Sequence, residues 1–416
     1  MKKRIIITTV ILAFVTIIAS GAFILNSKNN CEPAKIITAT DMHYLSPSLT
    51  DHGKVFWETI NNSDGKVIQY IDELMSAFSD EVISTSPDVL ILSGDLTFNG
   101  EKESHKDLAK KLAFIQDSGV QVLVIPGNHD INSSASVSLI GQEYKYVETV
   151  TPDEFKEIYY NFGIKQAESV DEYSLSYIYK VNSDLCILML DTNAYGTNFV
   201  QDESYEWIEA QLKKAKKEHM KVIAVSHQNL FAHNDLLSFG YQLYDADELL
   251  ALYNKYRVKL NISGHIHMQH YAKDGITEIT TTALAVSPNQ YGIVDFENNQ
   301  FKYSTRSVDV SAWAEKNAID DKNLMDFSDY SEDFFKNKTR TGEKLKESDI
   351  SDKDKALMLE TFADINANYF AGIPTDKEKY KEGIALWDKM EGNFSRKYLN
   401  SMLDDSNTDY RSITIK

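Results

Sequence analysis

The stretch VQVLVIPGNHD, residues 120–130, joins a run of mostly apolar residues to a cluster of polar ones. The apolar run, residues 120–125, has the length and composition of a buried β-strand. Pro126 and Gly127 mark the end of that strand, because both residue types punctuate regular structure. The side chains of Asn128, His129 and Asp130 are therefore expected directly at a strand end.

The same arrangement, an apolar run that ends in polar residues, recurs along the chain. Amphipathic stretches of helical period separate several of these runs. Such alternation of strands and helices predicts an α/β fold built in layers. Further strands are predicted at residues 36–40, 89–92, 186–190, 222–225 and 258–262, and helices at residues 67–78, 104–116, 205–218 and 247–256.

Two regions depart from this alternation. Residues 131–180 form a longer connection between two predicted strands. Within it, Thr151 and Glu154 are expected to make a capping box at the start of a helix that has proline in its first turn. Residues 271–310 alternate apolar and polar side chains, which predicts antiparallel strands that complete a second sheet. We assign residues 34–311 to one large α/β domain.

From about residue 312 the sequence becomes charged and helical. Ser351 is expected to start one helix that runs to about Tyr369, and a capping box of Thr375 and Glu378 to start another. We predict a small helical domain or cap over residues 312–416. The alternative is a helical tail that merely packs on the core.

The N-terminus predicts export. Lys2, Lys3 and Arg4 precede the uncharged, mostly apolar residues 5–25, a stretch long enough to cross a bilayer. The basic flank predicts that the N-terminus stays inside and that all that follows lies outside. The alternative is a cleaved signal, with small residues at 19–22 for processing. Residues 1–31 are therefore a membrane anchor or signal segment, and the rest is extracellular at the cell membrane or secreted.

The charge excludes one class of partner. The chain carries 62 acidic and 43 basic side chains, for a net charge of −19. A nucleic-acid duplex needs basic neutralisation, so we expect no duplex to bind. A small phosphate ester stays compatible with this charge, because bound metal ions reverse the local charge of a site.

The polar residues at the predicted strand ends are the types that bind metal ions. In open α/β sheets the carboxyl ends of the strands form the ligand crevice, so residues far apart in sequence converge there. Asp, His and Asn offer oxygen and nitrogen donors without a thiolate, a set that suits transition ions rather than a structural cysteine zinc site. The converging candidates are Asp41, His43, Asp95, Asn128, His129, His227, His265 and His267.

Each motif alone is weak, and their order along the chain is decisive. The order is Asp-x-His, Gly-Asp, Gly-Asn-His-Asp, a lone His after a strand, and Gly-His-x-His. This ordered set, across residues 36–267, resembles the calcineurin-like metallophosphoesterase family. The resemblance implies a two-sheet α/β sandwich that carries a dinuclear metal centre.

The resemblance also implies roles for the motif residues. One metal ion would be held by Asp41, His43, His267 and a bridging Asp95. The second would be held by the same aspartate with Asn128, His227 and His265. His129 would contact the substrate phosphate or protonate the leaving oxygen, and Asp130 would orient His129 through a hydrogen bond. A hydroxide that bridges the two metal ions would be the nucleophile.

The residues around Gly94-Asp95 narrow the resemblance. The segment GDLTFNG, residues 94–100, with His105 soon after, is similar to the branch that contains cyclic-nucleotide and glycerophosphodiester phosphodiesterases. Phe98 stands where purple acid phosphatases place a metal-binding tyrosine. Residues 101–103 stand where the family's phosphoprotein phosphatases carry an arginine. A phenolate-bound ferric ion and a protein phosphatase activity are therefore both disfavoured.

We expect an exported phosphodiesterase that hydrolyses a small phosphodiester, first a cyclic nucleotide and next a glycerophosphodiester, with two ions of Mn, Fe, Zn, Co or Ni. A phosphomonoesterase with the same site and a non-catalytic metal-binding surface protein are the alternatives. His233 is close enough to His227 in sequence to reach substrate, and His105 is expected to cap or pack its helix. The remaining histidines, His52, His219 and His270, are expected at the surface or an edge.

Overall fold

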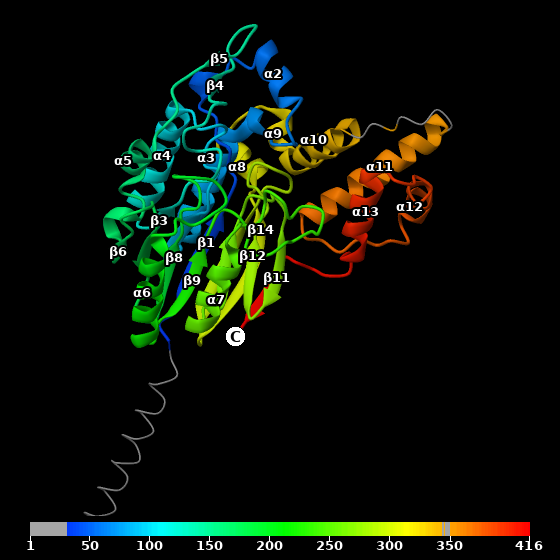
Figure 1. Ribbon diagram of the computed structural model, residues 1–416. Coiled ribbons are helices and arrows are strands. Elements are labelled where there is room, and N and C mark those ends of the chain that lie inside the picture. The colour runs from blue at the N-terminus through cyan, green and yellow to red at the C-terminus, as the bar shows by residue number, and fades with distance from the viewer. Residues whose placement is uncertain (1–30, 343–344, 346–349) are drawn as a thin grey trace, which may run out of the picture.

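The computed structural model describes residues 31–342, 345 and 350–416, and Figure 1 shows how they are arranged. The predicted membrane segment, residues 5–25, lies outside the described residues. Within the described part of the chain, none of the helices combines the length and the apolar character that a bilayer crossing requires.

The first large sheet has six strands in the order β15-β14-β13-β1-β2-β3. Its centre is parallel, because β1 runs alongside β2 and β2 alongside β3 in the same direction. The other half is antiparallel and reaches β1 through β13. The strands are β1 (Ala34–Ala39), β2 (Val89–Leu92), β3 (Gln121–Val124), β13 (Gln290–Glu297), β14 (Gln300–Ser307) and β15 (Ser412–Ile415).

The second large sheet has seven strands in the order β11-β12-β10-β9-β8-β7-β6. The four strands from β12 to β8 are parallel, and the strands at both edges are antiparallel. They are β6 (Ser169–Val170), β7 (Tyr177–Lys180), β8 (Leu185–Met189), β9 (Lys221–Val225), β10 (Leu260–Ser263), β11 (His270–Asp274) and β12 (Ile276–Thr280).

The two sheets pack face to face, as the alternation of side chains along β1 and β2 shows. Ile36 and Ile91 point into a core between the sheets, which they share with Ile187 and Ile223 of the second sheet. Their neighbours point the opposite way, as the period of two along a strand requires, and Leu90 packs in the core beneath the outer helices. The predicted two-sheet α/β sandwich is confirmed.

Helices cover the outer face of each sheet (Figure 1). Most lie within a residue or two of their predicted bounds. The first predicted helix is the exception, because it begins as the 3₁₀ turn η2 and continues to residue 85. On the first sheet lie η2 (Ile68–Tyr70), α3 (Ile71–Thr85) and α4 (Lys102–Asp117), and on the second α6 (Ser204–Lys217) and α7 (Ala246–Tyr256).

Short elements fill the connections between the sheets and helices. Residues 131–180 contain the predicted capping box, in which the Thr151 side chain and Glu154 bond each other's backbone N–H groups at the start of α5. The short elements are η1 (Pro47–Leu49), α2 (Lys54–Ile60), β4 (Val137–Ser138), β5 (Lys145–Tyr146), α5 (Pro152–Tyr159) and η3 (Ile164–Gln166).

The strands after residue 270 divide between the two sheets, which corrects the prediction that they all complete the second. The antiparallel pair β11 and β12 joins the second sheet, whereas the pair β13 and β14 extends the first. The chain between these pairs, residues 281–289, passes from one sheet to the other. Alternation along a strand reports which face is buried, but both sheets offer the same kind of buried face.

The C-terminal region is not helical throughout. Its first three helices pack with α3 in the core of the first sheet, whereas α11–α13 have a core of their own around the fully buried Trp387. β15 then returns to the edge of the first sheet, which corrects the prediction of helices up to residue 416. The helices are α8 (Val310–Lys316), α9 (Lys322–Met325), α10 (Phe327–Gly342), α11 (Asp352–Phe370), α12 (Lys381–Trp387) and α13 (Phe394–Asp404).

The two predicted caps in this region had different outcomes. Ser351 caps α11 by accepting a hydrogen bond from the backbone of Asp354, as predicted. The capping box at Thr375 is wrong, because α12 begins only at residue 381 and has no side-chain cap. Thr375 is instead buried, and its N–H donates to the carbonyl of Ser406.

Candidate metal centre

The motif residues lie on turns that directly follow β1, β2, β3, β9 and β10. At many of these positions the backbone itself is unusual. Residues other than glycine seldom adopt a positive φ, and such strain concentrates at functional sites. Positive values are found at Asp41 (51°), His43 (46°), Asp95 (47°), His265 (69°) and His267 (63°).

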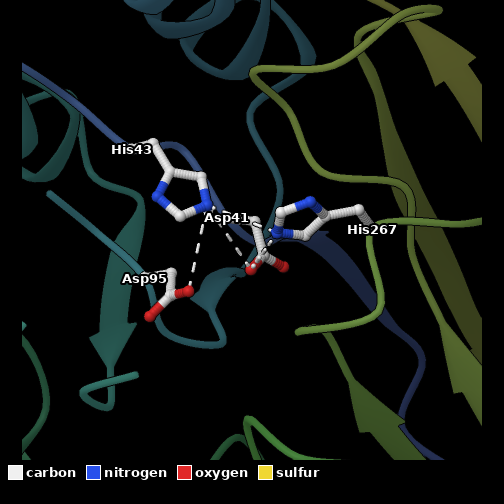
Figure 2. Close-up of side chains that lie close together, drawn as sticks. All are labelled: Asp41, His43, Asp95 and His267. Carbon is white, nitrogen blue, oxygen red and sulfur yellow. Dashed lines mark hydrogen bonds and ion pairs between the residues drawn. The ribbon is translucent and has the colours of Figure 1, made fainter. Parts of the chain in front are cut away.

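Four of these side chains form a first cluster, which Figure 2 shows. One possible ligand atom from each of Asp41, His43, Asp95 and His267 lies within 4.8 Å of all the others. The Nε2 atoms of His43 and His267 are 3.3 Å apart, and His267 Nε2 is 3.3 Å from Asp41 Oδ1. Nitrogen and oxygen donors that converge in this way are the ligand set of a transition metal ion.

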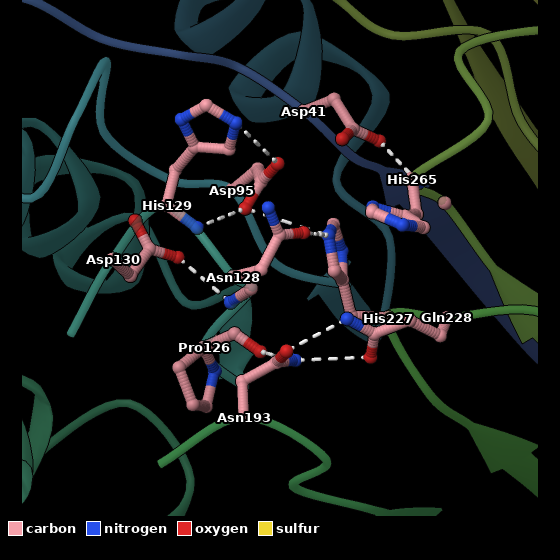
Figure 3. Close-up of polar contacts among 12 residues, drawn as sticks. Asp41, Asp95, Pro126, Asn128, His129, Asp130, Asn193, His227, Gln228 and His265 are labelled. Atoms are coloured by element: carbon pink, nitrogen blue, oxygen red, sulfur yellow. Dashed lines mark hydrogen bonds and ion pairs between the residues drawn. The ribbon is translucent and has the colours of Figure 1, made fainter. Parts of the chain in front are cut away.

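A second cluster shares Asp95 with the first (Figure 3). It consists of Asp95, His227 and His265, again with one atom of each within 4.8 Å of the others. His227 Nε2 lies 3.4 Å from Asp95 Oδ1 and 3.1 Å from Asn128 Oδ1. The other carboxylate oxygen, Oδ2, faces His43 at 3.8 Å. Asp95 thus directs one oxygen to each cluster.

Three of the histidines are held in place by acceptors behind their rings. His227 Nδ1 lies 2.9 Å from the Ser93 carbonyl, and His265 Nε2 lies 2.9 Å from the Gly240 carbonyl. His267 Nδ1 lies 3.4 Å from the carboxylate of Asp64. Each of these nitrogens donates a proton, which leaves the opposite nitrogen free to bind a metal ion, as in metal sites generally.

A buried atom without a partner tests whether a metal ion fits. Asp41 Oδ2 accepts hydrogen bonds from Thr40 Oγ1 at 2.7 Å and from the His265 N–H at 2.9 Å. Asp41 Oδ1 is buried and accepts no hydrogen bond from any described residue. Such an orphaned oxygen costs about 1–3 kcal/mol unless something compensates it. It points at two histidine nitrogens, so a cation between them would fit the residues present.

The glycines of the motifs leave room for the carboxylates. A Cβ on Gly127 would stand 2.2 Å from both the backbone nitrogen and Oδ1 of Asp95. One on Gly264 would stand 1.9 Å from Thr40 Oγ1 and 2.6 Å from Asp41 Oδ2. Glycine is therefore required at these two positions by close approach.

The electrostatics of the metal-free protein favour protons where the metal ions would lie. Burial alone would lower the pKa of His227, but the Asp95 carboxylate raises it to about 9. Burial is likewise outweighed at His267, where Asp41 raises the pKa to about 9. Protons thus balance part of the carboxylate charge, and a metal ion would have to displace them.

His129 is oriented differently from what the sequence predicts. Its Nδ1 lies 3.1 Å from the Phe98 carbonyl and 3.0 Å from Asn99 Oδ1. The ring is one third exposed, and its Nε2 lies 3.9 Å from Asp95 Oδ2. The predicted hydrogen bond between His129 and Asp130 is wrong, because the Asp130 carboxylate accepts from other groups and is turned away from the ring (Figure 3).

Asp130 instead ties two loops together. It accepts hydrogen bonds from the N–H groups of Leu96, Thr97 and Gly127, at 2.8–3.0 Å, and from the Thr97 hydroxyl at 2.9 Å. The loop that carries Asp95 and the loop that carries His129 are therefore held in a fixed relation. A carboxylate suits this place because all four partners are donors.

Two other pairs support the site without belonging to a predicted motif. Asn193 and Gln228 bond each other's amides, and Asn193 also donates to the Pro126 carbonyl (Figure 3). Asp64 lies behind His267, and Lys66 pairs with Asp64. Asn193 lies three residues after the end of the strand predicted at residues 186–190, and this position is a signal that could have identified it. Asp64 and Lys66 follow a helix, where no strand-end rule finds them.

Three of the remaining histidines are buried. His105 packs at the start of α4 against Tyr159, as predicted. His233 does not point at the metal-binding clusters, because its ring bonds Glu278 and His270. His270, predicted at the surface or an edge, lies on the edge strand β11 but is buried there, and it bonds Asp405 of the C-terminal region. Contacts from a distant part of the chain cover it, which local sequence does not reveal.

Comparisons with known families agree with this geometry. Residues 34–269 match the model of the calcineurin-like phosphoesterase family. Residues 309–409 match the model of the C-terminal domain of cyclic nucleotide phosphodiesterase. The two matches together account for most of the chain that the structure describes.

Individual relatives are distant. The chain is 26% identical over 191 residues to a protein of Xenorhabdus bovienii named probable cyclic nucleotide phosphodiesterase, covering 44% of this chain and 62% of that protein. It is 24% identical over 297 residues to one of Arcobacter nitrofigilis named probable glycerophosphodiester phosphodiesterase, covering 68% of this chain and 90% of that protein. A solved dimetal phosphatase from Danio rerio aligns with a TM-score of 0.49 at 11% identity, over 66% of this chain and 97% of that one. On the match over residues 34–269, the chain belongs to the calcineurin-like phosphoesterase family.

Proposed function

We propose that the protein is a dinuclear metal-dependent phosphodiesterase that hydrolyses a small phosphodiester. The observation that carries this proposal is the position of Asp95, whose two carboxylate oxygens face two separate clusters of ligand atoms. Two-metal sites of phosphatases keep their ions about 3.5–4 Å apart, and a carboxylate can bridge such a pair because it has one oxygen for each ion.

The residues of the site fall into two sets, one for each proposed metal ion. Asp41, His43, Asp95 and His267 would hold one ion, and the same Asp95 would hold the second with Asn128, His227 and His265. When bound, a pair of ions of Mn, Fe, Zn, Co or Ni supplies an activated water as nucleophile and stabilises charge on the phosphate oxygens. The chain itself sets the ligand positions through strained turns and the acceptors behind the rings.

His129 is placed to transfer a proton. With Nδ1–H donated to the Phe98 carbonyl or Asn99, only Nε2 is free to face a substrate. A proton on Nε2 would pass to the leaving oxygen of the ester, which needs one as its bond to phosphorus breaks. A positioned acid of this kind typically contributes roughly 10²–10⁴-fold in rate.

The substrate class rests on the relatives and on the C-terminal region. The matching model for residues 309–409 describes a domain of cyclic nucleotide phosphodiesterase, and two relatives carry phosphodiesterase names. A cyclic nucleotide is therefore the first substrate to test, and a glycerophosphodiester the second. A phosphomonoester is the competing substrate class, because the same ligand set serves both chemistries.

The proposed location follows from the N-terminal sequence. Residues 5–25 are apolar and follow three basic residues, so we propose that they anchor the protein with its catalytic part outside the cell membrane. Protease added to intact cells should digest the catalytic part if this is right, and should leave it untouched if the chain faces the cytoplasm.

A comparison of hydrolysis rates for several substrates tests the proposed activity. Initial rates with bis-(p-nitrophenyl) phosphate, p-nitrophenyl phosphate, a 3′,5′-cyclic nucleotide and a glycerophosphodiester are compared after loading with Mn²⁺. The proposal expects chelator-sensitive hydrolysis, with diesters preferred over the monoester. Preference for the monoester would favour a phosphomonoesterase, and bound metal without any hydrolysis would favour a binding role.

A further inference from the structure

The loop between α2 and η2, residues 61–67, brings a charged pair beside the first cluster. Asp64 Oδ2 lies 3.4 Å from His267 Nδ1 and 3.3 Å from Lys66 Nζ. One carboxylate oxygen therefore stands between the His267 ring and the Lys66 ammonium. His267 directs its other nitrogen, Nε2, at Asp41.

The loop is fixed to the body of the protein at several points. The Val67 N–H donates to the Ala285 carbonyl at 2.8 Å, and the Ala285 N–H in turn donates to the Asp41 carbonyl. Gly65 lies against Phe335 of α10 so closely that a Cβ there would stand 2.8 Å from its ring. The loop backbone that carries the charged pair is thus held in place, although the Asp64 side chain itself is half exposed.

The Lys66 side chain is unusual for a lysine. Only 9% of it is exposed, and lysine is seldom buried to this extent without full pairing. Its ammonium has three donors, and its one partner among the described residues is Asp64. The charge of this ammonium also acts on the rings of His43 and His267.

A buried cation next to a metal-binding cluster needs an explanation. It repels the ions that the cluster would bind, and burying it costs free energy that a single carboxylate offsets only in part. An anion that binds at the cluster would offset both the repulsion and the cost of burial, because it would attract the metal ions and the ammonium. A phosphate group has the charge and the acceptor oxygens for this role.

We propose that Lys66 binds a phosphoryl oxygen of the substrate at the side of the first cluster, with Asp64 holding the ammonium in position. This inference rests on the proposed function, since it names a further substrate-binding residue for the same site. The ammonium would donate charge-assisted hydrogen bonds to an oxygen that does not leave in the reaction. Negative charge on such oxygens is what a phosphoryl-transfer site has to stabilise.

The test uses Lys66→Met, which keeps the apolar stem and removes the charge, and Lys66→Arg, which keeps the charge. The matched control is Lys338→Met, because the half-buried Lys338 of α10 bonds Asn61 at the start of the same loop. Measurements are metal content, thermal unfolding, kcat and KM with bis-(p-nitrophenyl) phosphate, and inhibition by inorganic phosphate.

The inference expects Lys66→Met to fold and to keep its metal ions. Its kcat/KM should fall roughly 10–100-fold, and phosphate should inhibit it more weakly by a similar factor, as loss of a charged hydrogen bond implies. Lys66→Arg should recover part of the lost kcat/KM and part of the lost phosphate inhibition. Lys338→Met should behave as the wild type. Unchanged kcat/KM and phosphate inhibition, or a loss explained by missing metal, would overturn it.

Failure of the proposed function can be told apart from failure of this inference. If the wild type hydrolyses no ester, the binding of inorganic phosphate to the metal-loaded proteins is measured by calorimetry instead. Weaker binding to Lys66→Met than to the wild type would support the role of Lys66. Equal binding to both would overturn it.

Discussion

Replacing Gly127 by alanine should displace the carboxylate at the centre of the site. The new Cβ would stand 2.2 Å from Asp95 Oδ1, whereas ordinary contacts begin near 3.4 Å, so the carboxylate or its loop has to move by more than 1 Å. The backbone nitrogen of Asp95 is equally close, so a rotation of the side chain does not relieve the overlap. The backbone angles at Gly127 do not themselves require glycine, so the effect is steric.

The expected loss is large because both clusters depend on Asp95. A misplacement of this size typically costs on the order of 10²-fold in rate, and metal content should fall at the same time. Overpacking alone costs about 1–3 kcal/mol of stability, so the folded fraction has to be measured by thermal unfolding. The assay is metal content and kcat with bis-(p-nitrophenyl) phosphate at saturating Mn²⁺.

Gly383→Ala is the matched control for this substitution. It also creates a severe overlap, with Thr361 Oγ1 at 1.9 Å, but it lies in α12 within the C-terminal core. It should lower stability and leave metal content and kcat per folded molecule unchanged. The reasoning is refuted if Gly127→Ala folds, retains both metal ions and turns over substrate at the wild-type rate.

Three further results are expected. His129→Ala should keep the metal content and lose roughly 10²–10⁴-fold in kcat, and a loss of metal instead would contradict its role in proton transfer. Asp130→Asn should lower the free energy of unfolding by about 1.5–3 kcal/mol, because an amide nitrogen would meet a backbone donor, and denaturant titration measures this. Metal binding should release protons below pH 9 and strengthen as pH rises towards 9, because the raised pKa values of His227 and His267 keep them protonated. Calorimetry in buffers of different ionisation enthalpy would contradict this if the binding enthalpy did not vary.

The sandwich and the two clusters follow from local patterns in the sequence. Strand length, apolar character and the position of polar residues at strand ends are local properties, and the sheet geometry then brings Asp41, Asp95 and His227 together. The order of the motifs along the chain identified the family resemblance, which the spacing of single motifs does not reveal. The family resemblance that this order carries implied two ligand sets around Asp95. The structure groups Asp41, His43, Asp95 and His267 in one cluster and Asp95, His227 and His265 in the other, with Asn128 beside His227.

The features that escaped prediction depend on contacts between distant segments. Asp130 bonds the neighbouring loop rather than His129, and no local signal separates these two partners. Lys66 follows a helix, and its pairing with Asp64, which contacts His267, depends on a loop that packs on α10. β15 looks like part of a tail, because an edge strand of four residues has too few positions to show a period.

The most direct test of the central claim is the metal content of the purified full chain and of Asp95→Asn, measured by elemental analysis with hydrolysis of bis-(p-nitrophenyl) phosphate beside it. A carboxylate that bridges two ions predicts about two ions per wild-type chain, chelator-sensitive hydrolysis, and loss of both ions and of activity in the variant. An Asp95→Asn protein that keeps two ions and full activity would contradict the account, as would a wild-type chain that binds none.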